Sequence, residues 1–294
     1  MIEAGGGSVR AGAPVREIVV ESNWATGVRL ADGTRIDAAR FVASGIDAPG
    51  TLQLAGTEHF PEAVRAKLAN WHWGDHSLVT IHLALNQPPA YAAAKFDPDI
   101  DRAFNIFFGF DDTDQVVRSF ERCKASEFPD FPMGNGACNT LFDPTYAPQG
   151  KHAAFWWPFA PYALPGGPEE WDRRKPEITA RLLAVWRGYA SNLTPDNVLA
   201  TFLLAPLDVE RGNAAMRRGA VRLGAYVSSQ LGINRPHPLL AKNRTPLEGL
   251  YLCGSSCHGG GANGGPGYNA ANAIVADLKL ARPWTPIAPP EWSG

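Results

Sequence analysis

Hydrophobic and polar residues alternate along the first part of the chain with the period of β-strands. The dipeptide Asp32-Gly33 separates two such runs and is typical of a tight hairpin turn. The preceding residues, Glu3–Gly7, resemble the end of a helix that runs into a glycine cap. We therefore expect short strands at Val15–Glu21, Ala25–Leu30 and Arg35–Ser44, in a segment that continues a larger unit.

The middle of the chain contains segments with the period of a β-strand and segments with the period of an α-helix. The run SLVTIHLAL alternates and is rich in β-branched residues, whereas Ile178, Leu182 and Trp186 are spaced for one buried face of a helix. The pattern predicts an α+β region with an antiparallel sheet over residues 55–205. Its expected strands are Ser77–Leu85, Phe104–Phe110, Ala137–Phe142, Lys151–Phe159 and Asn197–Leu204, and its expected helices are Pro61–Asn70, Asp112–Lys124 and Glu169–Leu193.

The stretch Gly249–Leu280 predicts a strand, a glycine-dense turn and a helix. Leu250–Cys253 is a short apolar run, and Pro266 stands near the expected first turn of the helix, where its missing N–H has no cost. The free N–H groups and the positive dipole end of such a helix attract an anionic or polar ligand, and glycines allow it to approach the backbone. We expect a ligand site at this turn.

Composition limits the class of protein. The 294 residues are 45% hydrophobic and carry a formal net charge of −2, which gives no electrostatic case for binding nucleic acid. No apolar run has the length of a membrane span, and the N-terminal residues have no signal-peptide core. The four cysteines do not make a disulfide framework, and Cys253 and Cys257 with His258 lack a further ligand for zinc. We expect a cytoplasmic protein without a metal site.

The glycines Gly259, Gly261 and Gly264 formally match the dinucleotide-binding pattern G-x-G-x-x-G. The rest of that unit is missing, because no second strand follows the helix and no acidic residue ends one about 20 positions later. A self-sufficient NAD(P) site is therefore not expected.

The run LYLCGSSCHGGGANGGPGYNAANAI resembles the C-terminal flavin motif of the phytoene-dehydrogenase-like FAD-dependent oxidoreductases. That family includes carotenoid desaturases and the pyridine nucleotide-disulfide oxidoreductase domain 2 proteins. This chain departs from the motif at Gly259, where proline is usual, and at Tyr268, where a small or basic residue is more usual. The similarity continues over 6–32, 42–47, 142–150 with His152, 161–164, 171–172, 206–211, 235–236 and 245–246.

The resemblance implies a fold that is α/β and α+β, the C-terminal part of a two-domain FAD-binding, glutathione-reductase-like Rossmann fold. Residues 1–54 would be part of the FAD-binding domain, 55–205 a substrate-binding domain with an antiparallel sheet, and 206–294 a return to the FAD-binding domain. The family's N-terminal half, with its strand–GxGxxG–helix unit, is not in these 294 residues. We expect a split enzyme whose partner chain supplies that half, with a truncated polypeptide as the alternative.

The same resemblance implies the site residues. The helix start would face the pyrimidine edge of the flavin, Gly254 and Ser255 the ribityl and pyrophosphate region, Ser44–Asp47 the ribityl chain or the ring, and Val15 the adenine. His258 would lie beside the ring as the catalytic candidate, although a histidine that satisfies loop carbonyls is an equal alternative. The cofactor-binding candidates are Val15, Ser44, Gly45, Asp47, Gly254, Ser255, Gly260, Gly261, Gly264, Gly265, Pro266, Gly267, Tyr268 and Asn269.

These features predict a subunit or half of an FAD-dependent dehydrogenase or desaturase, inactive alone, that acts on an apolar small molecule. An alternative is a non-catalytic binding or assembly subunit that kept the fold without the cofactor. Association with a membrane surface is compatible with an apolar substrate. A set of aromatic residues suits a substrate pocket or a sheet core equally: Phe104, Phe107, Phe108, Phe155, Trp156, Trp157 and Phe159.

Overall fold

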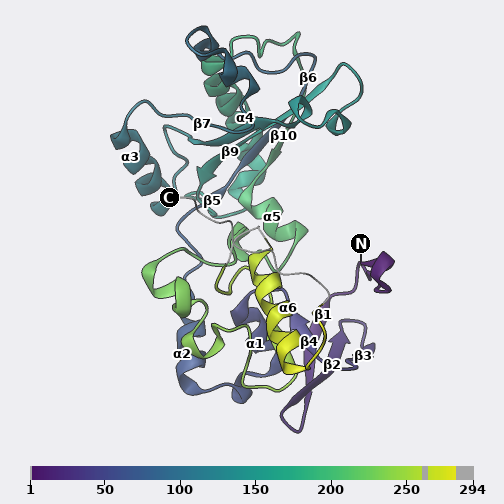
Figure 1. The fold of residues 1–294 in the computed structure, drawn as a ribbon. Helices are drawn as coiled ribbons and strands as arrows, with labels where there is room; N and C mark the ends of the chain where they lie inside the picture. Colours follow the sequence, from purple (N-terminus) through teal and green to yellow (C-terminus); the bar gives the residue numbers. More distant parts are fainter. Residues whose placement is uncertain (1, 260–263, 283–294) are drawn as a thin grey trace, which may run out of the picture. The chain divides into compact units, whose positions relative to one another are not determined.

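A computed structural model describes residues 2–259 and 264–282, and the chain in it forms two compact units. The first unit combines Met1–His72 with Arg222–Gly294, and the second is Trp73–Val221 (Figure 1). Each unit is a set of residues that contact one another more than they contact the rest of the chain. The assignment of residues 1–54, 55–205 and 206–294 to flavin-binding and substrate-binding domains stays a prediction.

The first unit begins with an antiparallel sheet in the order β1–β2–β3. Its strands are β1 (Val15–Glu21), β2 (Trp24–Leu30) and β3 (Arg35–Asp37). Gly33, in the turn between β2 and β3, has a φ of 89°, a conformation that glycine adopts without strain. The expected hairpin therefore forms where the Asp32-Gly33 signal placed it.

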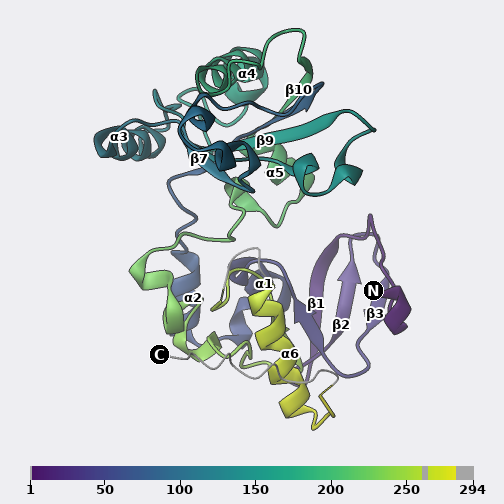
Figure 2. The same cartoon turned by 45° about the horizontal axis from the view of Figure 1, so that its top comes forward.

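A second sheet of this unit has two parallel strands from opposite ends of the sequence, β4 (Val42–Ser44) and β11 (Leu250–Leu252). Three helices accompany them: α1 (Ala48–Ala55), α2 (Glu62–Ala69) and α6 (Gly265–Asp277). Figures 1 and 2 show α6 running across the front of this unit with α1 behind it. The parallel pair thus joins the N-terminal and C-terminal parts of the chain.

The second unit is built on a six-stranded antiparallel sheet in the order β10–β6–β9–β8–β7, with β5 also paired to β9. Its strands are β5 (Ser77–Leu78), β6 (Thr80–Leu85), β7 (Ile106–Phe108), β8 (Gly134–Cys138), β9 (His152–Ala160) and β10 (Val198–Leu204). Its helices are α3 (Thr113–Lys124), α4 (Glu170–Tyr189) and α5 (Pro206–Gly212).

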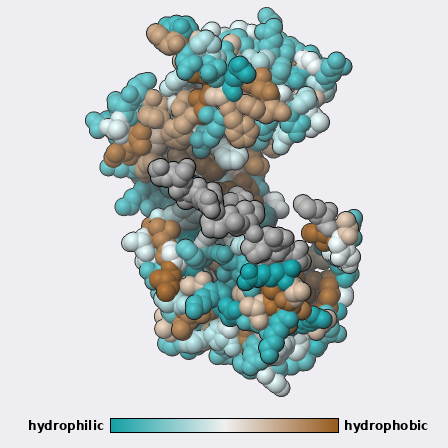
Figure 3. All heavy atoms as spheres, viewed as in Figure 1, coloured by the Kyte–Doolittle hydropathy of each residue, from teal (hydrophilic) through white to brown (hydrophobic). Residues whose placement is uncertain are grey.

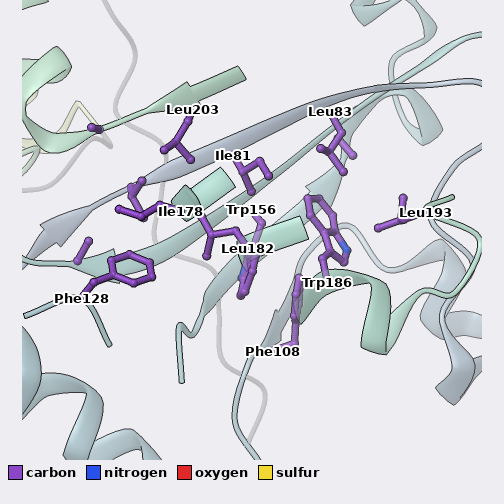
Figure 4. Close-up of a cluster of buried hydrophobic side chains, with 14 of the residues drawn as sticks. Ile81, Leu83, Phe108, Phe128, Trp156, Ile178, Leu182, Trp186, Leu193 and Leu203 are labelled. Atoms are coloured by element: carbon purple, nitrogen blue, oxygen red, sulfur yellow. The ribbon is translucent and has the colours of Figure 1, made fainter. Parts of the chain in front are cut away.

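One face of this sheet packs against α4. Side chains of the central strands, Ile81 and Trp156, are fully buried against Leu182 and Trp186 of the helix (Figure 4). Phe108 stacks on Trp156 with ring centroids 4.5 Å apart. The spacing of apolar residues in α4 predicted this buried stripe, and the burial of large aromatic side chains makes it the main core of the unit.

The opposite face of the sheet is aromatic and partly exposed, and Phe120 of α3 packs against Phe159 at one end of it. Alternate residues of β9 point there, so Phe155 is half-buried and Trp157 is 40% exposed. Phe202 on β10, paired with His82 on β6, is 63% exposed. Figure 3 shows hydrophobic side chains at the surface of this unit. The aromatic set thus divides between the two faces, because successive residues of a strand point to opposite sides.

The expected strand at Ala137–Phe142 is wrong in its position. The strand is Gly134–Cys138, and Asn139–Leu141 forms a 3₁₀ turn. A Cβ on Gly134 would lie 1.9 Å from the carbonyl oxygen of Trp157, so glycine is needed there for close strand contact and not for a turn.

Two α-helices, α1 and α5, were not predicted. The signal for α1 is Asp47, whose side chain accepts a hydrogen bond from the Gly50 N–H, followed by Pro49 in the first turn. Short 3₁₀ helices occupy Glu3–Gly5, Thr57–His59, Ala92–Lys95, Pro98–Arg102, Asn139–Leu141, Pro144–Tyr146, Arg217–Gly219, Ser228–Gln230, Gly232–Asn234 and Pro238–Leu240. Among the described residues, no helix is both long and apolar enough to cross a membrane.

Candidate functional site

The carboxyl ends of the parallel strands β4 and β11 meet in two closely packed turns. The turn after β4 contains Gly45, and the turn after β11 contains Gly254. A Cβ on Gly254 would lie 2.4 Å from the carbonyl oxygen of Gly45 and 2.7 Å from that of Ile46. Because ligands of open α/β sheets bind outside the carboxyl ends of the strands, this is the position expected of a cofactor site.

Buried polar side chains fix the turn after β4 to the start of α1. Asp47, 1% exposed, caps the helix, and the Ser44 hydroxyl lies 2.7 Å from the Thr51 hydroxyl. The Ala48 N–H donates to the hydroxyl of Ser256 across the two turns at 2.9 Å. Thr51 and Ser256 were not predicted, and nothing in a single sequence marks a hydrogen bond between residues 208 positions apart.

The turn after β11 is held by a buried arginine, Arg235, which the sequence analysis placed within the family resemblance without giving it a role. Arg235 is 2% exposed, and its guanidinium donates two hydrogen bonds to the Ser255 carbonyl, at 2.9 and 3.1 Å. Its other hydrogen bonds go to the carbonyls of Arg222, Gly224, Ala225 and Gln230. Burial lowers the pKa of Arg235 from its usual value. The side chain therefore acts as a charged clamp on backbone oxygens.

The start of α6 is tied to the end of β11. Gly264, the residue that precedes the helix, has a φ of 71°, and Pro266 is buried in the first turn. The Asn243 side chain donates to the Leu252 carbonyl at 2.8 Å and to the Pro266 carbonyl at 3.4 Å. A Cβ on Gly267 would meet no atom within 4 Å, so its part of the first turn has open space beside it. The helix thus offers N–H groups at a rigidly placed N-terminus.

His258 and Asn269 lie together on the surface of this region. They line a shallow cavity of about 440 Å³ that also includes Asn243, Arg244 and Asn272. The Asn269 amide donates to the His258 carbonyl at 3.5 Å, and His258 is exposed. Both alternatives for His258, a substrate contact and a loop histidine, are compatible with this position.

The predicted residues do not all converge. Ser44, Gly45, Asp47, Gly254 and Ser255 lie at the paired strand ends, and Gly264, Gly265, Pro266, Gly267 and Tyr268 form the nearby helix start. Val15 is 39% exposed at the beginning of β1, where it pairs with Leu30 in the other sheet of the unit. Gly260 and Gly261 lie outside the described residues.

The two cysteines of this turn are unsuited to redox chemistry. Burial raises the pKa of the Cys257 thiol to about 12 and also raises the pKa of Cys253. Both sulfurs are free thiols. Because the thiolate is the reactive form, a dithiol mechanism is disfavoured here.

Polar contacts attach the far end of α6 to the strand beneath it. Asp277 accepts two hydrogen bonds from the Arg244 guanidinium, at 2.7 and 2.9 Å, and one from the Tyr251 hydroxyl at 3.0 Å. The Arg244 guanidinium holds the pKa of Asp277 below its usual value, and the Tyr251 hydroxyl adds to this effect. The helix is therefore anchored at both ends.

This anchor gives a pH-dependent prediction. The pKa of Asp277 is lower in the folded state than in the unfolded state. Its contribution to the free energy of unfolding is therefore fully present above the unfolded pKa and is lost as the pH falls through the folded pKa. We expect Asp277→Asn to lower the free energy of unfolding at pH 7 by less than about 1 kcal/mol, because the pair is partly exposed. The difference from the wild type should shrink below about pH 4 in urea titrations. Asp196→Asn, at an exposed turn, is the control, and a pH-independent difference at Asp277 would contradict the assignment.

Comparison with known proteins identifies relatives. No protein-family model matches the chain. The chain is 32% identical over 287 residues to a subunit of limonene dehydrogenase from Castellaniella defragrans, and 30% identical over 282 residues to pyridine nucleotide-disulfide oxidoreductase domain-containing protein 2 of Mus musculus. It is 27% identical over 284 residues to a lycopene-forming phytoene desaturase of Pseudescherichia vulneris.

These matches cover 92%, 93% and 94% of this chain but 51%, 48% and 52% of the relatives. The chain thus spans about half the length of the curated relatives it matches. Among solved structures, it resembles a protein assigned as a protoporphyrinogen oxidase from Exiguobacterium sp. 255-15, with a TM-score of 0.54, 14% identity, and coverage of 93% of this chain and 48% of that one. A putrescine oxidase variant gives a TM-score of 0.50 at 14% identity, with coverage of 94% and 49%.

The similarities confirm two predictions. The chain resembles the phytoene-dehydrogenase-like oxidoreductases, as its glycine motif indicated, and its fold is that of about half a flavin-dependent oxidoreductase. The mixture of α/β and antiparallel sheet elements agrees with the predicted fold class.

Proposed function

We propose, from its relationship to the phytoene-dehydrogenase-like FAD-dependent oxidoreductases, that this chain is the flavin-closing half of a dehydrogenase or desaturase. A partner chain with the GxGxxG half would complete the cofactor site, and the chain alone would be inactive. The observation that carries the proposal is the meeting of the β4 and β11 carboxyl ends beside the N-terminus of α6.

The residues at this junction fit one side of FAD. The N–H of Gly267 and the positive dipole end of α6 suit the electron-rich pyrimidine edge of the flavin, and the open space at Gly267 leaves room for it. The backbones of Gly45 and Gly254, which have no Cβ, would lie along the ribityl chain, and Val15 would approach the adenine as the family resemblance implies. The bound flavin would supply the redox chemistry by accepting a hydride from a substrate carbon.

His258 and Asn269 would contact the substrate or line the edge of the flavin pocket. Both lie on the cavity at the start of α6. The described residues that line that cavity include no carboxylate and no second imidazole, so His258 is the titratable candidate that we assign a substrate contact.

One relative supports the proposal of a partner chain. The chain covers about half of its relatives, and one of these is named as a subunit of a dehydrogenase. A chain that carries the ADP-binding unit would account for the part of FAD that these residues leave uncovered.

The exposed aromatic face of the second unit's sheet suits an apolar substrate. Phe155, His82 and Phe202 form a row across three strands, with ring centroids 6.4 and 6.1 Å apart. Trp157 lies on the same face, 4.9 Å from the ring of Phe155. Such exposed aromatic side chains supply apolar contact area of the kind that apolar small molecules bind.

We expect Trp157→Ala to raise KM for an apolar substrate about five- to tenfold with a smaller change in kcat. The indole contributes contact area on the exposed face, and its loss weakens ground-state and transition-state binding alike. Steady-state kinetics of the flavin-loaded complex measure this, with Tyr146→Ala, an exposed aromatic of a loop, as the control. Equal KM values for both variants would remove this face from the substrate site.

Co-purification tests the proposal itself. The full chain, tagged and purified from its native cells, is expected to bring along a GxGxxG-containing chain and bound FAD, visible as flavin absorbance, whereas the chain alone should be colourless. A stable colourless complex or homo-oligomer from the same cells would favour the non-catalytic assembly role.

A further inference from the structure

A second cavity, of about 610 Å³, lies in the second unit. It is formed by the loop 91–105, by β7 and by the last turn of α4, where Gly188 and Tyr189 lie. Sites for small molecules usually measure about 300–1,000 Å³. All the residues that line this cavity belong to the second unit, so it shares none with the turns of the first unit that we propose to face the flavin.

The loop that forms one wall of the cavity is held in place by hydrogen bonds. Just before it, the Ala90 N–H donates to the Asn192 side chain at 2.9 Å. The Tyr91 N–H donates to the Asp101 carboxylate at 2.8 Å, which closes the loop on itself. The Trp186 indole N–H donates to the Tyr91 hydroxyl at 3.2 Å. Because this wall is preformed, a ligand would bind without first having to order the loop.

The walls of the cavity are mainly apolar. Phe108 is part of the lining, and its ring centroid lies 5.2 Å from that of Tyr189 and 5.7 Å from that of Trp186, which is beside it in Figure 4. Ile100 and Ile106 add aliphatic surface. Since the burial of apolar surface is favourable, such walls suit the hydrocarbon part of a ligand.

One charged side chain stands at the cavity. The Lys95 ammonium lies 4.7 Å from the centroid of the Phe96 ring, and both residues are exposed parts of the lining. Lys95 forms no ion pair with any residue that the structure describes. Of the described residues, no carboxylate lines the cavity, and the Asp97 and Asp101 side chains of the same loop accept hydrogen bonds from backbone N–H groups. The cavity therefore combines apolar walls with one positive charge at its rim.

We propose that this cavity binds an amphiphilic carboxylate, a small molecule with a hydrocarbon body and one terminal carboxylate. The body would lie against Phe108 and Ile106, and the carboxylate would accept a charge-assisted hydrogen bond from Lys95. The proposal goes beyond the redox role and does not depend on it. The cavity shares no residue with the exposed row of Phe155, His82 and Phe202 either.

Two probes of equal chain length test the site. Decanoate carries the carboxylate, and decan-1-ol is its neutral counterpart. Isothermal titration calorimetry measures the binding of each probe, below the concentration at which decanoate forms micelles, to the full chain as purified from native cells. We expect one decanoate to bind per chain.

Lys95→Met tests the selection for an anion. Methionine keeps much of the length of the side chain but removes its charge. We expect this variant to weaken decanoate binding about five- to tenfold and decan-1-ol binding less than about twofold. The matched control is Lys124→Met, at an exposed lysine in the last turn of α3 that does not line the cavity, and it should bind both probes as the wild type does.

Gly188→Phe tests the place of binding. A Cβ on Gly188 would meet no atom within 4 Å, so there is space beside the helix for a larger side chain at the cavity wall. We expect the phenyl ring to weaken the binding of both probes at least about tenfold. The matched control is Gly212→Phe, because Gly212 is the last residue of α5, has equally open space at its Cβ and does not line the cavity. Thermal denaturation checks that each variant folds.

The outcomes distinguish this inference from the proposed function. Equal decanoate affinities in Gly188→Phe and Gly212→Phe would mean that the probe binds elsewhere, and would overturn the inference. So would a Lys95→Met variant in which the affinities for decanoate and decan-1-ol change by the same factor, because the cavity would then not select a carboxylate. A flavin-containing complex that binds no decanoate overturns the inference alone. A chain that binds decanoate as expected but never yields a flavin complex contradicts only the proposed function.

Discussion

Replacing Arg235 with methionine is expected to lower the free energy of unfolding of the first unit by at least about 3 kcal/mol. The guanidinium is 2% exposed and donates to five carbonyl oxygens, those of Arg222, Gly224, Ala225, Gln230 and Ser255. Methionine fills much of the volume but supplies no donor, so these buried acceptors lose their partner. Urea denaturation followed by circular dichroism measures the change.

Two further variants test whether the several N–H donors of the Arg235 guanidinium are responsible for this stabilisation. Arg235→Lys keeps the charge but has a compact ammonium that cannot reach five carbonyls, so we expect most of the loss to remain. Arg222→Met is the matched control, because the Arg222 side chain is not buried and stacks over Tyr226 at 5.1 Å. A change within about 0.5 kcal/mol is expected there. Equal stabilities for Arg235→Met and Arg222→Met would refute the clamp.

The glycine turn after β11 could be predicted from the sequence, but the role of Arg235, which holds this turn, could not. Gly254 and Ser255 are visible in the sequence because strand, glycine turn and helix follow one another within a single short stretch. Arg235 stands in a loop without periodicity, and its role depends on five backbone oxygens brought together by the fold. A buried arginine cannot be told from an exposed one in a single sequence.

Secondary structure was predicted well where the local sequence alone determines it. The strand Val15–Glu21 was predicted with its observed bounds, because it is rich in β-branched residues and is joined to the next strand by hairpin signals. The strand at Gly134–Cys138 was misplaced, because its glycines allow close contact with β9 and carry no alternating pattern. The pairing of β4 with β11 joins residues from opposite ends of the chain and was not predicted.

The division of the aromatic residues shows a further limit. Trp156 and Trp157 are adjacent and chemically alike, yet the first is fully buried under α4 and the second is 40% exposed. Strand alternation requires that they point to opposite faces, but it does not say which face the helix covers. That choice depends on the packing of α4, so the buried face and the exposed face could not be distinguished from the sequence.

The second large effect is expected at Gly254, where the turns after β4 and β11, which we propose to face the cofactor, touch each other. A Cβ at this position would lie 2.4 Å from the Gly45 carbonyl oxygen and 2.7 Å from that of Ile46, both backbone atoms with little freedom to move. Gly254→Ala should therefore separate the turns, destabilise the isolated chain by about 1–3 kcal/mol and lower FAD retention in the complex at least about tenfold. Denaturation of the chain and flavin absorbance of the purified complex measure the two effects.

The control for this prediction is Gly188→Ala. Gly188 lies near the end of α4, and a Cβ there meets no atom within 4 Å. Alanine is a better helix former than glycine, so this variant should gain about 0.5–1 kcal/mol and retain FAD as the wild type does. If Gly254→Ala loses stability but keeps its flavin, the contact between the turns is structural and the cofactor lies elsewhere. If both stability and flavin fall together, the close approach of β4 and β11 is what shapes the cofactor site.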